Sequence, residues 1–118
     1  MHIPNTFDAN CPTRLILDRI ADKWTVLALA LLMGGPVRFN ELRRRIDGVS
    51  QKMLSQTLKS LERDGLVSRK ATPTVPVTVE YSITPLGATL AATIDGLRVW
   101  AECNINDVLA AQKRYDAV

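Results

Sequence analysis

Apolar residues recur every three or four positions along most of this chain, which is the spacing of one face of an α-helix. Most of these stretches begin or end at a residue that commonly caps helices or forms turns, such as serine, asparagine or glycine. The predicted helices are one that begins after Cys11 with Pro12 at its first position, Asp22–Met33, Glu41–Ile46 capped by Asn40, one capped by Ser50 that ends at Asp64-Gly65, and one from Pro85, capped by Thr84, to about Gln112.

Two segments have the apolar/polar alternation of β-strands, Val67–Ala71 and Val77–Ile83. Two prolines stiffen the loop between them, and Val37–Phe39 is a third, short strand candidate. A hairpin that directly follows a helix-turn-helix pair is the winged arrangement. We therefore predict a mainly α fold with a small β hairpin, a winged helix-turn-helix, in a single domain over residues 1–118 with a flexible segment 1–10.

The segment Asp22–Met33 is apolar on nearly all faces of the helix that it predicts. Helices of this kind are normally central and buried. The following Gly34-Gly35-Pro36 ends the helix, because glycine adopts the left-handed cap and proline cannot continue the helix.

The composition indicates a protein without membrane segments. With 118 residues, of which 47% are hydrophobic, the chain can form one domain with a core. No apolar run is long enough to span a bilayer, and Met1–Asn10 lacks the pattern of a signal peptide. We expect a cytoplasmic protein with no membrane partner.

The net charge of +3 is distributed unevenly along the chain. Arg38–Lys70 holds nine basic and four acidic residues, whereas the two flanks together hold six and eight. A basic centre suggests an anionic partner for that part of the chain alone. The alternative is a solvated surface rich in arginine.

The predicted helix after Ser50 has two contrasting faces. An apolar stripe at helical spacing must face the core and consists of Met53, Leu54, Thr57, Leu58 and Leu61. The opposite face carries no acid until Glu62 and can donate hydrogen bonds to base edges in a DNA major groove. An ordinary solvated surface is the alternative, although such surfaces usually mix acids with bases. The residues of this face are Gln51, Lys52, Ser55, Gln56 and Lys59.

Basic side chains and helix N-termini near this helix can bind phosphates, which gives affinity without sequence preference. Three consecutive arginines, 43–45, cannot all point one way on a helix, so at least one should face away from DNA or toward an acid such as Glu41. The further DNA-binding candidates are Arg38, Asn40, Arg43, Ser50, Arg69 and Lys70.

The last helix has more apolar surface than one small core can cover. Its apolar residues continue at spacings of three or four over the whole region 86–112, and the first helix has a similar surplus. Pairing of two chains through these terminal helices would bury the surplus and set two recognition helices about 34 Å apart on a near-palindromic site in double-stranded DNA. The alternative is that the helix folds back on its own core. The predicted homodimer interface consists of Leu15, Leu90, Ile94, Leu97, Trp100, Ile105 and Val108.

Several motifs, taken in order, resemble the HxlR-type family of regulators over Cys11 to about Trp100. That family is similar to the MarR group, and the resemblance implies a dimeric winged-helix repressor or activator, with some members sensing aldehydes, quinones or oxidants. The chain departs from the family pattern at the wing, where uncharged residues replace an acid and a base, so the wing must rely on Arg69 and Lys70. The matching motifs are Cys11-Pro12, Asp22–Thr25, Gly35–Leu42, Val49–Leu54, Leu58–Leu66, Val75-Pro76 and Glu80–Gly87.

The two cysteines are the candidates for redox sensing. Some members of the resembled family use a cysteine at the place of Cys11 as their sensor, so an oxidant or a small electrophile is an expected effector. The alternative is a buried cysteine that packs like a small hydrophobe. Cys103 lies in the last helix, and a disulfide with Cys11 between crossed chains would require Cα atoms within about 7 Å.

Other functions have weaker support in the sequence. The single histidine, His2, and the absence of nucleophile, phosphate-loop or zinc motifs argue against an enzyme, and no cofactor is expected. One alternative is a winged-helix module that binds protein instead of DNA. Another is a regulator controlled, without cysteine chemistry, by a small apolar ligand near Trp24 and Trp100.

Overall fold

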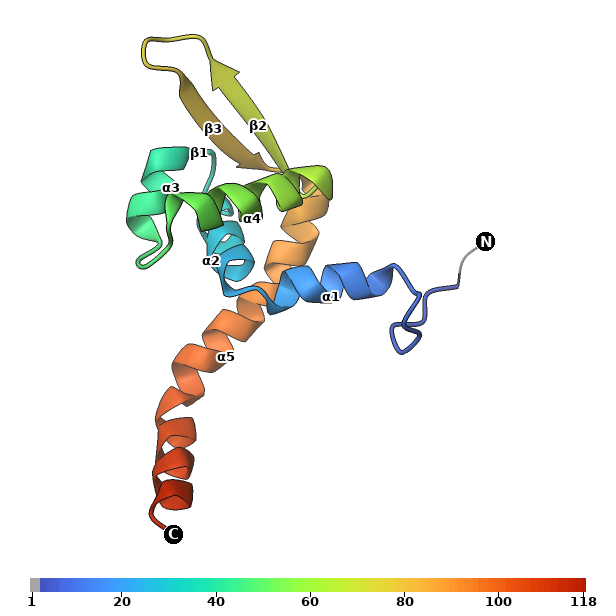
Figure 1. Ribbon diagram of the computed structural model, residues 1–118, viewed down its shortest axis with the longest axis vertical. Coiled ribbons are helices and arrows are strands. Elements are labelled where there is room, and N and C mark those ends of the chain that lie inside the picture. Colours follow the sequence, from blue (N-terminus) through green and yellow to red (C-terminus); the bar gives the residue numbers. More distant parts are fainter. Residues whose placement is uncertain (1–2) are drawn as a thin grey trace.

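The computed structural model describes residues 3–118, and over them the chain forms five helices and three strands (Figure 1). Residues 1 and 2 of the predicted flexible segment 1–10, and with them His2, lie outside the described residues. The elements are α1 (Thr13–Ala21), α2 (Lys23–Leu32), β1 (Val37–Arg38), α3 (Phe39–Arg45), α4 (Gln51–Arg63), β2 (Val67–Thr72), β3 (Thr78–Ile83) and α5 (Pro85–Asp116).

Three polar side chains fix the helix starts. The Asp22 carboxylate accepts from the Trp24 N–H at 2.9 Å, and the Ser50 hydroxyl accepts from the Met53 N–H at 3.1 Å. The Thr84 hydroxyl accepts from the Gly87 N–H at 3.0 Å. Each bond satisfies one of the N–H groups that a helix start leaves without a partner. The predicted caps Ser50 and Thr84 are therefore confirmed.

The predicted cap Asn40 is wrong. Helix α3 begins at Phe39, directly after strand β1, and Asn40 lies within its first turn. Arg38 takes the capping position with an extended backbone and no side-chain bond, because it is still paired to β3 as a strand residue. At the other end of the chain, α5 continues to Asp116, beyond the predicted limit at Gln112.

The strands form one antiparallel sheet in the order β1-β3-β2. The predicted hairpin is present as β2 and β3, and the short predicted strand joins its other edge. In this register Val37 lies opposite Tyr81, and Glu80 lies between Arg38 and Lys70. The mainly helical winged fold is therefore as predicted, with three strands in the sheet.

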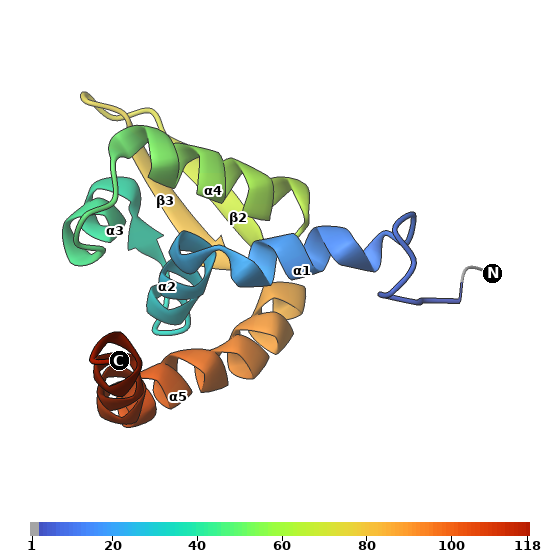
Figure 2. The ribbon, with the colours of Figure 1, turned by 60° about the horizontal axis from the view of Figure 1, so that its bottom comes forward.

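Helix α2 forms the centre of the core, as its all-round apolar character predicts. It contacts α1, α4, α5 and β3, and its Ala28, Leu29 and Leu32 are fully buried (Figure 2). The buried face of α4 and the start of α5 complete this core. Burial of this kind is the main source of a small domain's stability.

The first turn of α5 passes very close to the base of the hairpin. A Cβ added at Gly87 would overlap the carbonyl oxygen of Leu66, so only glycine allows this crossing. The Thr84 N–H donates to that same carbonyl, and the Thr84 hydroxyl donates to the Gly65 carbonyl at 2.7 Å. These contacts attach the start of α5 to the hairpin.

Two helical limbs extend from this body. Figures 1 and 2 show α1 and the C-terminal half of α5 leaving the body in different directions, and the molecule measures 59 × 43 × 23 Å. Among the described residues, no helix has the length and apolar character needed to cross a membrane.

Candidate nucleic-acid interface

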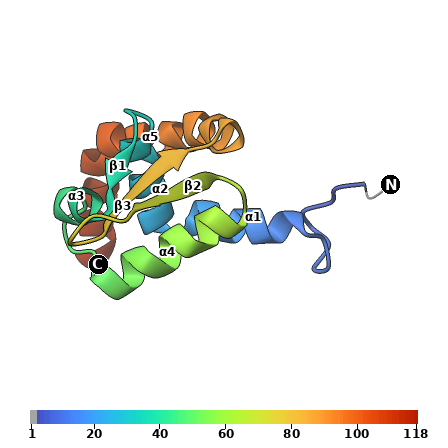
Figure 3. The ribbon, with the colours of Figure 1, turned by 90° about the horizontal axis from the view of Figure 1, so that it is seen from above.

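A wide groove separates helices α3 and α4 from the β2–β3 hairpin. It has a volume of about 1300 Å³ and is open to solvent. Figure 3 looks down on this side of the molecule, with α4 beside the hairpin and α3 at one end. Seven of the predicted DNA-binding residues line the groove, namely Arg38, Asn40, Arg43, Gln51, Ser55, Lys59 and Arg69.

Helix α4 presents its polar face to solvent. Its inner face buries Leu54, Thr57, Leu58 and Leu61, which is the predicted apolar stripe except for one residue. Met53 is 39% exposed, so its assignment to the core is wrong: it follows the first capped turn and lies at the edge of the stripe.

The outward residues of α4 divide between two flanks. Gln51, Ser55 and Lys59, spaced four apart, line the groove beside the hairpin. Gln56 lines a crevice of about 330 Å³ on the opposite flank, near the start of α2. Lys52 is exposed as well, so the helix has a free polar edge for its whole length.

The three arginines of α3 differ in their surroundings, as the helical spacing requires. Arg44 forms an ion pair with Glu41, which confirms the prediction that one arginine turns toward an acid. Arg43 and Arg45 also line the groove and are exposed. Arg45 was missed as a candidate because sequence alone did not show which arginines turn toward the groove.

Basic side chains outnumber acidic ones in the groove. Only two acids are among its lining residues over the described part of the chain, and one of them is the Glu41 that already binds Arg44. An excess of positive charge in an open groove attracts polyanions. The basic lining residues are Arg38, Arg43, Arg44, Arg45, Lys59 and Arg69.

The hairpin carries its positive charge at the base of the wing. Arg69 and Lys70 are exposed there, whereas residues 71–79 include no charged side chain. The Thr74 hydroxyl donates to the Pro76 carbonyl at 2.8 Å and lies 2.9 Å from the Thr78 hydroxyl. The tip is thus held by internal hydrogen bonds, and the cationic side chains lie nearer its base.

One further basic residue lies in line with the outer face of α4. Arg63 is exposed, and helical spacing puts it on the same side as Lys52 and Lys59. It was missed because it lies at the C-terminal end of the helix, whereas base-reading residues cluster at the N-terminal end.

The two cysteines lie in different environments. Cys11 is buried at 4% exposure, its sulfur accepts from the Asn5 N–H at 3.3 Å, and the Thr13 hydroxyl lies 3.1 Å away. Cys103 is exposed on α5. Figures 1 and 2 show the start of α1 and the C-terminal half of α5 on different sides of the body.

The predicted interface residues fall into two groups. Ile94 is 2% exposed within the chain's own core, and Leu90 packs against that core. Ile94 is therefore not available to a partner helix. The other residues lie on the limbs and are exposed, or half-buried in the case of Val108: Leu15, Leu97, Trp100, Ile105 and Val108.

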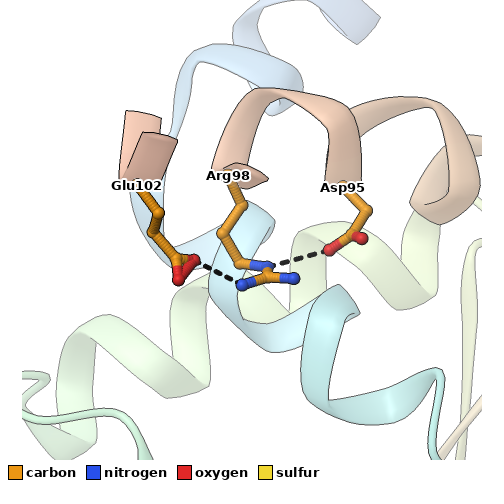
Figure 4. Close-up of polar contacts among 3 residues, drawn as sticks. All are labelled: Asp95, Arg98 and Glu102. Carbon is orange, nitrogen blue, oxygen red and sulfur yellow. Dashed lines mark hydrogen bonds and ion pairs between the residues drawn. The ribbon is translucent and has the colours of Figure 1, made fainter. Parts of the chain in front are cut away.

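A charged network marks the point where α5 leaves the core. Arg98 donates to Asp95 from Nε at 2.9 Å and to Glu102 from Nη1 (Figure 4). The hydrogen bond to Asp95, followed by the charges of both acids, raises the pKa of Arg98 above its ordinary value. Arg98 therefore keeps its positive charge. It lies one helical turn after the buried Ile94, on the same side of α5.

The tryptophans do not form a common ligand site within one chain. Trp24 packs against the core, with the Lys23 ammonium 4.5 Å from its ring centre. Trp100 is 60% exposed on the outer part of α5. Trp24 lines the crevice beside Gln56, and Trp100 is not among the residues that line that crevice.

Comparison with known proteins gives consistent matches. The model of the HxlR-like helix-turn-helix family matches residues 19–108. An uncharacterised HTH-type transcriptional regulator of Escherichia coli, YtfH, is 46% identical over 108 residues, covering 92% of this chain and 86% of the relative.

Solved structures agree with these sequence matches. The putative transcriptional regulator ytfH from Salmonella typhimurium has a TM-score of 0.90 and 43% identity, covering 94% of this chain and 99% of that one. The redox regulator HypR in its reduced form has a TM-score of 0.73 and 39% identity, covering 85% and 98%. The matches are to regulators of transcription rather than to enzymes.

Proposed function

This chain belongs to the HxlR-like helix-turn-helix family of transcriptional regulators, and from that premise we propose that it binds a near-palindromic operator in double-stranded DNA as a homodimer. In this proposal α4 enters the major groove, and Gln51, Ser55 and Gln56 face base edges. Phosphates are bound by the basic residues around α4, namely Arg38, Arg43, Lys52, Lys59, Arg69 and Lys70, with Asn40 and Ser50 beside them.

The observation that carries this proposal is the exposed polar edge of α4, which has no acid before Glu62, beside a basic groove. Gln51, Ser55 and Lys59 line that groove, and the outer edge of α4 is open to solvent. An α-helix has the width to enter a major groove, and cations on its flanks then meet the two phosphate strands. A module that binds protein would have no need for this excess of positive charge.

The exposed apolar residues on the limbs support the homodimer. Leu15 on α1 is 60% exposed, and Leu97 and Trp100 on α5 are 53% and 60% exposed. Such exposed apolar surface, here on the two helices that extend from the body, is typical of an interface between chains. A two-fold axis through these helices would relate two copies of α4, as a near-palindromic site requires.

The test is the salt dependence of DNA affinity. A fluorescently labelled duplex from the region upstream of this chain's own gene is titrated at 50 and 200 mM salt and followed by anisotropy. We expect affinity to fall steeply, by about tenfold for each two phosphate contacts over this range. Binding that is weak and insensitive to salt would favour the protein-binding module instead.

A pair of lysine variants tests the part played by α4. Lys59→Ala should weaken binding to every duplex and reduce the salt slope by about one, because one phosphate contact is lost. Lys113→Ala removes the same charge from the exposed end of α5 and should leave the DNA affinity and the salt slope unchanged. Equal effects of the two variants would mean that only the net charge matters.

We further propose that Cys11 makes this regulator responsive to oxidants. The HypR neighbour is a redox regulator, and here Cys11 is buried between the N-terminal segment and α1. Any group added to its sulfur must displace Asn5 or Thr13, which contact it. Because α1 belongs to the proposed dimer interface, this displacement would change the relation between the two DNA-binding helices.

This second proposal is tested with diamide and two serine variants. The DNA affinity of the parent should change on diamide treatment, and Cys11→Ser should abolish the change. Cys103→Ser is the matched control. If the DNA affinity of this variant also no longer changes on diamide treatment, the two thiols act together. A Cys11→Ser protein that responds like the parent would rule out this role of Cys11.

A further inference from the structure

Glu80 lies between two cations in the middle of the sheet. In the strand register it is directly opposite Arg38 on β1 and Lys70 on β2. Residues at such positions have side chains on the same face, with Cβ atoms about 4.5–5.5 Å apart. The three residues therefore form a row of alternating charge, positive, negative and positive, across the strands.

Glu80 differs from the other acid in the groove. The Glu41 carboxylate is bound by Arg44 on its own helix. Glu80 is half-buried, lines the groove together with Arg38, and has no ion pair within 4.0 Å among the described residues. Its negative charge thus acts on both cationic neighbours without being neutralised by a direct partner.

We propose that Glu80 limits the affinity of this protein for DNA by competing with phosphate for Arg38 and Lys70. The inference rests on the proposed function. A phosphate that approaches either cation must overcome the attraction between that cation and the carboxylate, and is itself repelled by it. Phosphate contacts do not depend on sequence, so the limit applies to any duplex, while the base contacts of α4 are unaffected.

The charge-removing variant Glu80→Gln tests this role. We expect it to bind an unrelated 24-base-pair duplex about three- to tenfold more tightly at about 100 mM salt, and the upstream duplex by the same factor. The salt slope should steepen by up to about one. Asp116→Asn removes the same charge from the exposed C-terminal end of α5 and should change affinity less than about twofold.

A double-mutant cycle assigns the effect to the two cations. In a background that carries Arg38→Gln and Lys70→Gln, the gain from Glu80→Gln should disappear, because no contact remains for the carboxylate to weaken. If Glu80→Gln does not fold, Glu80→Thr replaces it, since a β-branched residue suits a strand. Thermal melting monitored by circular dichroism confirms the fold of each variant.

The outcomes separate this inference from the proposed function. Unchanged or weaker binding by the folded Glu80 variant, with salt-dependent binding by the parent, would overturn the role of Glu80 alone. An equal gain in the background without the two cations would overturn it as well. A parent that binds neither duplex would overturn the proposed function and the inference together.

Discussion

The two halves of α5 have similar apolar spacing but different surroundings. In the first half, Pro85–Ile94, the chain buries Gly87, Ala91 and Ile94 against its own core. In the second half, Leu97–Asp116, no residue is buried, although large apolar side chains continue at helical spacing. The change occurs at the network of Asp95, Arg98 and Glu102 (Figure 4).

One amphipathic helix can therefore contribute both to the folding of its own chain and to an assembly of chains. The first half completes the DNA-binding domain and is attached to the hairpin through Thr84 and Gly87. The second half leaves apolar surface uncovered in a single chain, which is costly in water unless a partner covers it. Variants in the first half should therefore change folding, and variants in the second half should change assembly.

The largest expected effect is that of Gly87→Ala. The added Cβ would overlap the Leu66 carbonyl oxygen. Because this oxygen belongs to the backbone, it cannot move away as a flexible side chain can. We expect the free energy of unfolding to fall by about 3 kcal/mol or more, measured by urea denaturation. A denaturation midpoint equal to that of the parent would show that α5 is not packed this closely on the hairpin.

Leu97→Glu should have the next largest effect, on assembly and DNA binding rather than on folding. A charge in the middle of the proposed interface should give a monomer at micromolar concentration in analytical ultracentrifugation. Operator affinity should fall about 100-fold, because the two DNA-binding helices are no longer linked. Asn106→Glu, on a different side of α5, adds the same charge as a control. A dimer dissociation constant of Leu97→Glu equal to that of the parent would contradict the proposed interface.

Thr84→Ala tests the anchor of the first half. It removes the cap of α5 and the bond to the Gly65 carbonyl, and should cost about 1–2 kcal/mol of unfolding free energy. Thr93→Ala is the matched control, because the Thr93 hydroxyl only bonds the Thr89 carbonyl within the helix. A loss at Thr93 as large as at Thr84 would argue against a special role of the anchor.

The smallest expected effect is a gain at the second glycine of the helix. No atom lies within 4 Å of a Cβ built at Gly96, so Gly96→Ala should stabilise the helix by up to about 1 kcal/mol. Thermal melting measures the gain. A loss comparable to that of Gly87→Ala would mean that the helix at Gly96, where the two halves join, is packed as closely as at Gly87.

The local features of the fold could be predicted because local rules determine them. Ser50 and Thr84 cap helices through bonds to residues three positions away, so the signal lies within one turn of sequence. Asn40 was misassigned because pairing of Arg38 with β3, a distant contact, extends the strand up to the helix. The interface assignment of Ile94 failed for a similar reason, since spacing does not reveal where a helix leaves its own core.

The polar face of α4 could be predicted from the sequence, but the groove between this helix, α3 and the hairpin could not. The polar edge of α4 follows from helical period, and Gln51, Ser55 and Lys59 lie together as that period requires. The contribution of Arg45 and the position of Glu80 between Arg38 and Lys70 depend on how α3 and the strands come together. Such contacts between distant segments cannot be read from one sequence.

Dimethyl sulfate footprinting of the upstream DNA tests the central claim most directly, because this reagent methylates guanine N7 in the major groove. If two copies of α4 enter the groove one turn apart, two clusters of protected guanines should appear about ten base pairs from each other. Lys52→Ala combined with Lys59→Ala should remove both. A bound duplex whose guanines all remain reactive, or a single protected cluster, would contradict the account.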